Sequence, residues 1–348
     1  MEMDERKVKI LQAIINDYIN YGEPLGSRTI AKKYDLGISS ATIRNEMADL
    51  EEMGFLEQLH TSSGRKPSDK GYRLYVDRLM KISTITPEEE EAIKSYLIDI
   101  AFYEIDKIIK SATNILSELT NLTSIVKSPS VRKSSIKIIQ LIILDKISIL
   151  STIITDNGII KHNVIKISNP IDNAKLLKVN NILNKALSGI TVQQISLDFL
   201  LNLKQELAGY EEIFDAILPV LYESLVSNEN DGIYTQGTTN IFKYPEYQNI
   251  DKAKEFLVLV DNEENLKNLL DQDTVQGKLS VKIGQENFIE CAKECSIITA
   301  TYSYNGDTLG TIGVIGPTRI PYGRVISILG SIVNEINNNI SKIYDNSR

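Results

Sequence analysis

The sequence has few of the side chains on which catalysis and metal binding usually depend. It contains two histidines, two cysteines and no tryptophan in 348 residues. We interpret His60 as a solvent or phosphate contact and His162 as an edge-strand residue, so we do not expect an enzyme. Cys291 and Cys295 lie four residues apart in an apparently helical segment, but no histidine or further cysteine accompanies them. We therefore expect no metal site and no cofactor.

Phosphate-binding loops and long apolar runs are missing as well. The glycines of TLGTIGVIG at 308–316 lie in a strand-like alternation and lack the Lys-Ser/Thr ending of a nucleotide loop. No apolar run approaches the length of a membrane span, and the charged start MEMDERKVK has no apolar region behind it. The sequence therefore predicts a cytoplasmic protein that does not bind the membrane.

Neither the first 81 residues nor the rest of the chain carries a net positive charge. The net charge is −8, yet residues 1–81 hold 13 basic and 13 acidic side chains and are neutral. All of the excess negative charge lies beyond residue 81, where it should repel nucleic acid. At 348 residues the chain is also longer than one hydrophobic core usually serves, so we expect two or three domains.

Residues 27–53 have the pattern of two short helices joined by a turn. Ser27 is a suitable N-cap for the first helix, and Gly37 lies in the turn. The second helix begins at Ser39 and Ser40. Its apolar residues recur at helical spacing and should pack against the first helix. These residues are Ile43, Met47, Leu50 and Met53.

Polar residues occupy the outward side of the second helix, mainly in its first two turns. A recognition helix reaches the major groove of DNA with this part, where arginine suits guanine and asparagine suits adenine. The outward residues are Ser39, Ser40, Thr42, Arg44, Asn45 and Asp49. We predict that base recognition rests on Thr42, Arg44 and Asn45.

A strand and a basic turn follow, and they favour DNA binding. Residues 55–59 alternate as a short strand, and the turn after them is small, polar and then basic. Such a wing can lie along the phosphate backbone or enter the minor groove. Helix pairs joined by a glycine turn also occur in proteins that never bind DNA, but a purely structural pair has no need of a basic wing. The predicted DNA-binding residues are Ser27, Arg28, Ser39, Ser40, Thr42, Arg44, Asn45, Ser62, Ser63, Gly64, Arg65 and Lys66.

Beyond the wing, helical and strand-like stretches alternate. Ser68 can cap a helix to Met80, and Thr86 with Glu89 forms a capping box that opens a helical stretch to about Val126. The patterns predict strands at 135–144, 147–155 and 159–167, a helical island at 169–227, and strands at 256–260, 278–284, 297–304 and 308–316. Asp156-Asn157-Gly158 and Asn305-Gly306 are typical of hairpin turns. This order indicates one sheet domain with an insertion, although two independent domains would give a similar pattern.

Two separated parts of the chain resemble a known family. The run from SSATIRNEM at 39–47 to YRLYVDRLM at 72–80 is similar to the amino-terminal region of the heat-inducible transcription repressor HrcA family. IGQENF at 283–288 and GTIGVIGPTRIPYGRVI at 310–326 resemble the carboxy-terminal signature of that family. The resemblance covers essentially the whole chain, although 168–232 matches only as a helical region of the expected length.

The resemblance implies a multidomain α+β fold. The expected parts are a winged helix-turn-helix DNA-binding domain at 1–81, a discontinuous GAF-like domain at 87–167 and 233–348, and an inserted dimerisation domain at 168–232. It also implies a homodimeric repressor of chaperone operons that binds an inverted-repeat operator, named CIRCE, in double-stranded DNA. A GroEL-type chaperonin would maintain its activity, which heat stress would remove. A regulator that senses a small molecule is the alternative, because GAF-like pockets often bind ligands.

Overall fold

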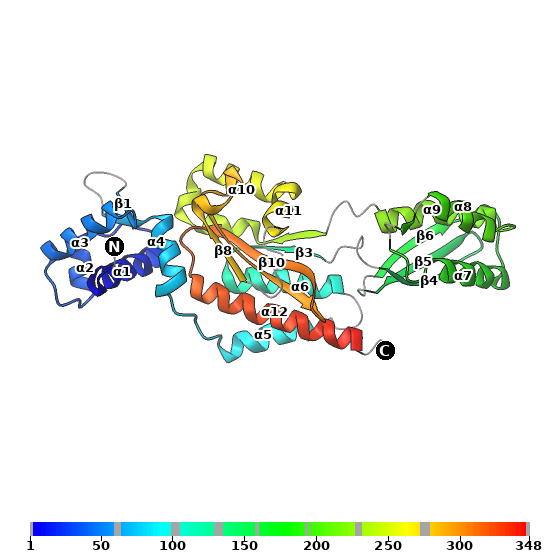
Figure 1. Ribbon diagram of the computed structural model, residues 1–348, viewed down its shortest axis with the longest axis horizontal. Coiled ribbons are helices and arrows are strands. Elements are labelled where there is room, and N and C mark those ends of the chain that lie inside the picture. Colours follow the sequence, from blue (N-terminus) through cyan, green and yellow to red (C-terminus); the bar gives the residue numbers. More distant parts are fainter. Residues whose placement is uncertain are drawn as a thin grey trace.

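The computed structural model contains three units arranged along one long axis (Figure 1). Amino-terminal helices form one end, a sheet flanked by helices forms the middle, and a second helix-and-sheet unit forms the other end. The fold is therefore of the mixed α+β type. The structure describes residues 3–58, 64–98, 105–128, 135–156, 160–191, 194–195, 197–226, 232–271 and 279–345. Within these residues no helix has both the length and the apolar character that crossing a membrane requires.

The amino-terminal unit, here called the head, consists of short helices and one hairpin. Its elements are α1 Glu5–Tyr21, α2 Ser27–Lys33, α3 Ser40–Glu52, β1 Leu56–Gln58, β2 Arg65–Pro67, α4 Asp69–Leu74 and the π-helical turn η1 Tyr75–Leu79. Asp4 caps α1 by accepting the backbone N–H groups of Arg6 at 2.6 Å and Lys7 at 3.0 Å. The apolar stripes of α1, α2 and α3 meet in a buried core that includes Ile14, Ile30, Ile43 and Leu50.

The middle unit, here called the body, is built on a five-stranded antiparallel sheet with the order β7-β3-β10-β9-β8. The strands are β3 Thr123–Lys127, β7 Ile233–Gln236, β8 Leu279–Ile283, β9 Cys295–Tyr304 and β10 Asp307–Pro317. Asn305 and Gly306 connect β9 to β10, and both have positive φ, at 48° and 97°. These angles suit the two-residue turn that matches strand twist, so the hairpin predicted there is confirmed.

Helices cover both faces of this sheet. One core joins it to α5 Pro87–Ile98, α6 Ile105–Thr120 and α12 Tyr322–Asp345, and the other joins it to α10 Ile250–Asp261 and α11 Glu263–Asp271. Short 3-10 turns complete the body at η4 Thr238–Lys243, η5 Pro245–Gln248, η6 Gly284–Glu286 and η7 Glu290–Ala292. The capping box at the start of α5 is confirmed, since Thr86 and Glu89 each accept the backbone N–H of the other, at 3.2 and 3.0 Å.

The third unit, here called the insert, has its own sheet and core. The strands β4 Ile136–Ile143, β5 Ser148–Thr155 and β6 Ile160–Lys166 form a three-stranded antiparallel sheet in that order. The helices α7 Asn173–Leu187, α8 Leu197–Glu206 and α9 Glu211–Val226 pack on it. The turn predicted at 156–158 joins two strands that do pair, although Asn157 and Gly158 lie outside the described residues.

The structure corrects the expected membership of the sheets. The strands at 136–166 were expected to share a sheet with the carboxy-terminal strands, but they form a separate one. β3 and β7 pair directly, with Ser124 opposite Gln236, so the chain leaves the body and returns to it at neighbouring strands. Alternation of side chains reveals a strand but not its hydrogen-bonded neighbour, and for this reason the pattern was ambiguous.

Three local expectations were also wrong. The helical stretch expected to reach Val126 ends at Thr120, and 123–127 is a strand. The run FLVLV at 256–260 belongs to α10 and not to a strand, because a five-residue apolar run does not distinguish a buried helix from a buried strand. The segment around the cysteines is a 3-10 turn followed by the start of β9. Burial there raises the pKa of the Cys295 thiol to about 12.

Candidate nucleic-acid interface

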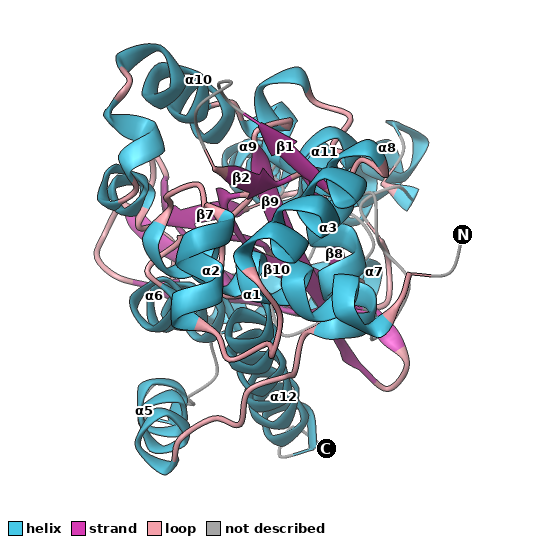
Figure 2. Ribbon diagram, turned by 90° about the vertical axis from the view of Figure 1, so that its left-hand side faces the viewer, coloured by secondary structure: helices cyan, strands magenta, loops and turns pink. Residues whose placement is uncertain are grey.

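The outer side of α3 collects the polar residues predicted to read bases. Ser39 is the N-cap of this helix, and its Oγ accepts the backbone N–H of Thr42 at 3.1 Å and lies 3.0 Å from the Thr42 hydroxyl. Arg44 and Asn45 are exposed, while Ser40 and Thr42 are half-buried. Viewed from the head in Figure 2, α1, α2 and α3 lie towards the viewer, and the β1–β2 hairpin lies beside them.

Acidic residues fix α3 against α1 from behind. Glu46 is buried, and its carboxylate lies 2.7 Å from Lys7 Nζ and 3.5 Å from an Arg6 nitrogen. Lys7 Nζ also lies 3.0 Å from Asp49. The hydrogen bond to Glu46, followed by that to Asp49, raises the pKa of Lys7. These contacts fix the orientation of α3 relative to α1. The opposite side of α3 does not pack into the core.

The basic wing is closer to neutral than the sequence suggested. Arg65 Nη2 lies 2.7 Å from Glu51 Oε2 on α3, and Lys66 Nζ lies 3.3 Å from Glu57. Because surface ion pairs contribute little stability, a phosphate group can replace the exposed Glu57 carboxylate beside Lys66 at small cost. The tip residues Ser62 and Ser63 lie outside the described residues.

Close backbone packing requires glycine at position 64, which the sequence alone did not show. The backbones of Leu25 and Arg65 exchange hydrogen bonds of 3.0 and 2.8 Å. A Cβ on Gly64 would lie 2.4 Å from the Leu25 carbonyl, so only glycine fits. The wing is therefore anchored to the segment between α1 and α2.

The start of α2 differs from the expectation in one detail. Ser27 is the first helical residue rather than the N-cap, a position that Gly26 takes without a side-chain hydrogen bond. Arg28 and Lys32 are exposed on α2. Among the residues that the structure describes, Arg28, Lys32 and Arg44 form no ion pair, so these cations are available to phosphate or base edges.

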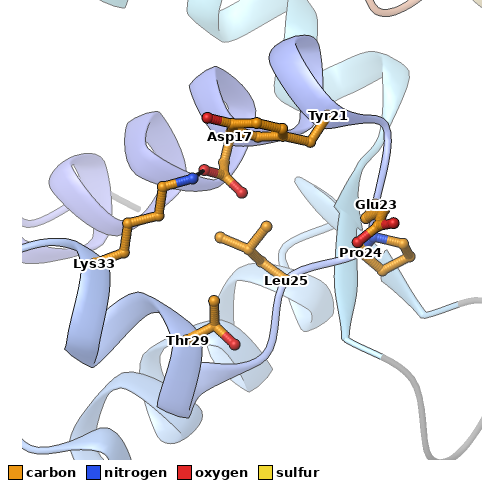
Figure 3. Close-up of a pocket in the computed structure, with 7 residues that line it drawn as sticks. All are labelled: Asp17, Tyr21, Glu23, Pro24, Leu25, Thr29 and Lys33. Atoms are coloured by element: carbon orange, nitrogen blue, oxygen red, sulfur yellow. Dashed lines mark hydrogen bonds and ion pairs between the residues drawn. The ribbon is translucent and has the colours of Figure 1, made fainter.

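A small cavity between α1 and α2 was not anticipated. It measures about 370 Å³ and is lined by Asp17, Tyr21, Glu23, Pro24, Leu25, Thr29 and Lys33 (Figure 3). The buried Asp17 carboxylate accepts hydrogen bonds from Lys33 and, at 3.1 Å, from the Tyr34 hydroxyl. The hydrogen bond to Asp17 raises the pKa of Lys33. We interpret the Asp17–Lys33 ion pair as a contact that holds α1 and α2 together. An aspartate within the apolar stripe of α1 was the signal that sequence reasoning passed over.

Comparison with known proteins gives a consistent result along the whole chain. A family model described as "HrcA protein C terminal domain" matches residues 106–326. A relative from Clostridium acetobutylicum called "Heat-inducible transcription repressor HrcA" is 56% identical over 343 residues, with 99% of both chains covered. A relative of the same name from Ruminiclostridium cellulolyticum is 44% identical over 348 residues, with 99% of this chain and 100% of the relative covered.

A solved structure shares the fold. It is described as "Crystal structure of a hypothetical protein at 2.2 A resolution" and aligns over 98% of this chain and 100% of its own, with a TM-score of 0.74. Its sequence identity is 24%. The arrangement of head, body and insert therefore also occurs at low sequence identity.

Proposed function

Because the chain belongs to the HrcA family of heat-inducible transcription repressors, we propose that it represses heat-shock (chaperone) operons by binding an inverted-repeat operator of the CIRCE type as a dimer. The family is one of regulators rather than of enzymes, as the scarcity of histidine predicted. The observation that carries the proposal is the exposed polar side of α3, beside a hairpin that bears Arg65 and Lys66.

The proposed domains follow the three units. Residues 3–81 are a winged helix-turn-helix domain, with α3 as the recognition helix and β1–β2 as the wing. Residues 87–128 and 232–345 are a GAF-like domain. The inserted domain spans 135–226 rather than 168–232, because β4, β5 and β6 share a core with α7, α8 and α9.

The insert also supplies the proposed dimer interface, although through a different surface from the one expected. The dimerisation domain was expected in the helical region 168–232, but these helices bury most of their leucines and isoleucines against the three-stranded sheet. The opposite face of that sheet, here called the open face, carries exposed apolar side chains: Ile138, Ile142 and Val164 are 42%, 43% and 58% exposed. Ile142, Leu150 and Val164 are cross-strand neighbours on it. A second copy of the chain would cover these residues.

The remaining part of the proposal concerns heat. We propose that heat stress removes the active form, as the name of the relatives suggests, and that a GroEL-type chaperonin maintains that form. The open face would leave a monomer with uncovered apolar surface, which is the feature that chaperones recognise. A small-molecule sensor is less well supported, because apolar side chains from two cores fill both faces of the described five-stranded sheet.

Substitution of Arg44 tests the proposal. Arg44→Ala should weaken binding to the operator by about 1–3 kcal/mol and binding to random DNA by much less, if Arg44 makes a bidentate contact to guanine. Lys175→Ala is the control, because it removes one positive charge from an exposed position on α7 of the insert. Titration of each variant with both DNAs separates the cases. Equal losses on both DNAs would make Arg44 a phosphate contact, and no loss would remove α3 from the interface.

A further inference from the structure

The head packs directly on the body, because the two units share one apolar core. Tyr72 of α4 is buried and packs on Tyr322 at the start of α12, with ring centroids 5.9 Å apart. The Tyr322 hydroxyl donates a hydrogen bond to the Thr318 carbonyl at 2.5 Å and lies 2.6 Å from Ser296 Oγ. The apolar clusters of head and body are therefore continuous.

A first polar contact joins α4 to η6. Asp69 Oδ2 accepts the backbone N–H of Gln285 at 2.9 Å. A Cβ on Gly284 would lie 1.9 Å from Asp69 Oδ2, and the φ of Gly284 is +53°, so two reasons demand glycine there. Arg73 forms an ion pair with Glu286, with Nε 2.8 Å from Oε1, and donates to the Val281 carbonyl at 2.5 Å. One acidic and one basic side chain of α4, Asp69 and Arg73, therefore contact the segment from Val281 to Glu286.

A second polar contact holds the end of α1. Arg319, which is only 7% exposed, forms an ion pair with Glu246 and lies over the Tyr244 ring, 5.2 Å from its centroid. Its Nη1 donates to the Ile19 carbonyl at 3.3 Å, where the helix dipole favours a cation. A Cβ on Gly22 would lie 2.9 Å from the guanidinium carbon, so the head approaches Arg319 closely.

These contacts, here called the clasp, act on two different elements of the head. The clasp consists of Asp69, Arg73, Glu246, Gly284, Gln285, Glu286 and Arg319. One attachment on α4 alone would leave the head free to rotate about it. The second attachment on α1 removes that freedom, so the direction of α3 is fixed relative to the body, which lies between the head and the insert (Figure 1).

We propose that Arg73 and Arg319 are positioning residues that set the spacing between half-sites which the dimer accepts. This inference rests on the function proposed above. In a dimer joined through the inserts, the separation of the two α3 helices depends on how rigidly each head is held. A rigid head reads one spacing and one helical phase, because a change of half a turn, about 5 base pairs, moves a half-site to the other side of the duplex. A loosened head tolerates several spacings.

The first test measures this rigidity without DNA. Hydrogen exchange is compared in wild type, in Arg73→Ala and in the double variant Arg73→Ala with Arg319→Lys, all as full-length chains. Amides of 69–75 and 283–287 should exchange about tenfold faster in the double variant, because local opening becomes easier. Amides of α3 should keep their protection, which shows that the head is still folded. Unchanged exchange at 283–287 would overturn the proposal.

The second test measures spacing directly. Duplexes carry two inverted half-sites at a series of separations, and a further duplex carries one half-site. Wild type should lose about tenfold or more in affinity for half-turn changes, whereas the double variant should vary by less than about threefold and bind the single half-site as wild type does. Lys94→Ala, which breaks an exposed ion pair with Glu90 on α5, is the control and should behave as wild type. A double variant with the wild-type spacing profile would refute the positioning role. If wild type bound neither the two-half-site duplexes nor the single half-site, the proposed function would be wrong. The hydrogen-exchange result would still show whether the clasp holds the head on the body.

Discussion

The two larger sheets of this protein differ in how much of their surface is covered. The five-stranded sheet has helices on both faces, and eight successive residues from the start of β9 are buried. The three-stranded sheet has helices on one face, and β5 alternates strictly between buried and half-buried residues. Yet the uncovered positions of the smaller sheet include the apolar residues Ile138, Ile142 and Val164. Exposed apolar side chains of this kind favour contact with a partner, and no described segment of the chain covers those of the smaller sheet.

The three-stranded sheet is closed at its β4 edge. The edge strand β4 is closed by side chains from α7: Asn184 accepts the N–H of Ile139 at 2.8 Å and donates to its carbonyl at 2.5 Å. Asn180 accepts the N–H of Leu141 at 3.1 Å. Edges blocked in this way do not pair with other chains. At β4 a partner would therefore meet the open face rather than the strand edge.

Charges on the open face should have the largest effect. Ile142→Asp with Val164→Asp should convert the dimer into a monomer and reduce operator affinity by about 100-fold or more, because buried unpaired carboxylates prevent association and a single head covers only a half-site. Light scattering and operator titration measure the two effects. Leu177→Asp is the control, since Leu177 is 61% exposed on α7. A monomer from Leu177→Asp and a dimer from the double variant would place the interface on the helices instead.

A methyl group inside the covered sheet should have the next largest effect. A Cβ on Gly313 of β10 would lie 2.4 Å from the Ile298 carbonyl oxygen, so Gly313→Ala should lower the free energy of unfolding by about 1–3 kcal/mol. Gly330→Ala in α12 is the matched control, because no atom lies within 4 Å of its added Cβ. That change should instead raise the free energy by about 0.5–1 kcal/mol through helix propensity. Urea unfolding compares them, and equal stability of the two variants would mean that the sheet is less tightly enclosed than described.

The smallest effect is expected at the closed edge. Asn184→Ala leaves the N–H and carbonyl of Ile139 without their side-chain partner and should cost about 1 kcal/mol, since water partly replaces the lost bonds. The neighbouring exposed Asn181→Ala is the control and should be neutral or slightly stabilising. Hydrogen exchange at Ile139 should rise only in the first variant. A rise in both would point to loosening of α7 as a whole.

Local signals in the sequence predicted local structure well. Ser68 caps α4, Thr86 and Glu89 form their capping box, and Asn305-Gly306 makes the hairpin. Each depends on a few neighbouring residues whose preferences are strong. FLVLV at 256–260 was misread because its length fits a strand as well as a helix.

What the sequence did not reveal depends on residues far apart in the chain. The separate sheet of the insert follows from the pairing of β3 with β7 across more than 100 positions. The ion pairs of Arg73 with Glu286 and of Arg319 with Glu246 likewise join distant segments. On the candidate interface, Arg44 and Asn45 are exposed as predicted, but the pairing of Arg65 with Glu51 had no signal in the local pattern.

Footprinting on the DNA upstream of the organism's own chaperonin operon tests the central claim most directly. Hydroxyl radicals would map contacts of the wild-type protein and of Arg44→Ala. A dimer that reads an inverted repeat should protect two segments related by a two-fold axis, one for each recognition helix, and both should be weakened together in Arg44→Ala. A single asymmetric protected segment, or no protection at concentrations that already bind random DNA, would contradict a dimer reading an inverted repeat through α3.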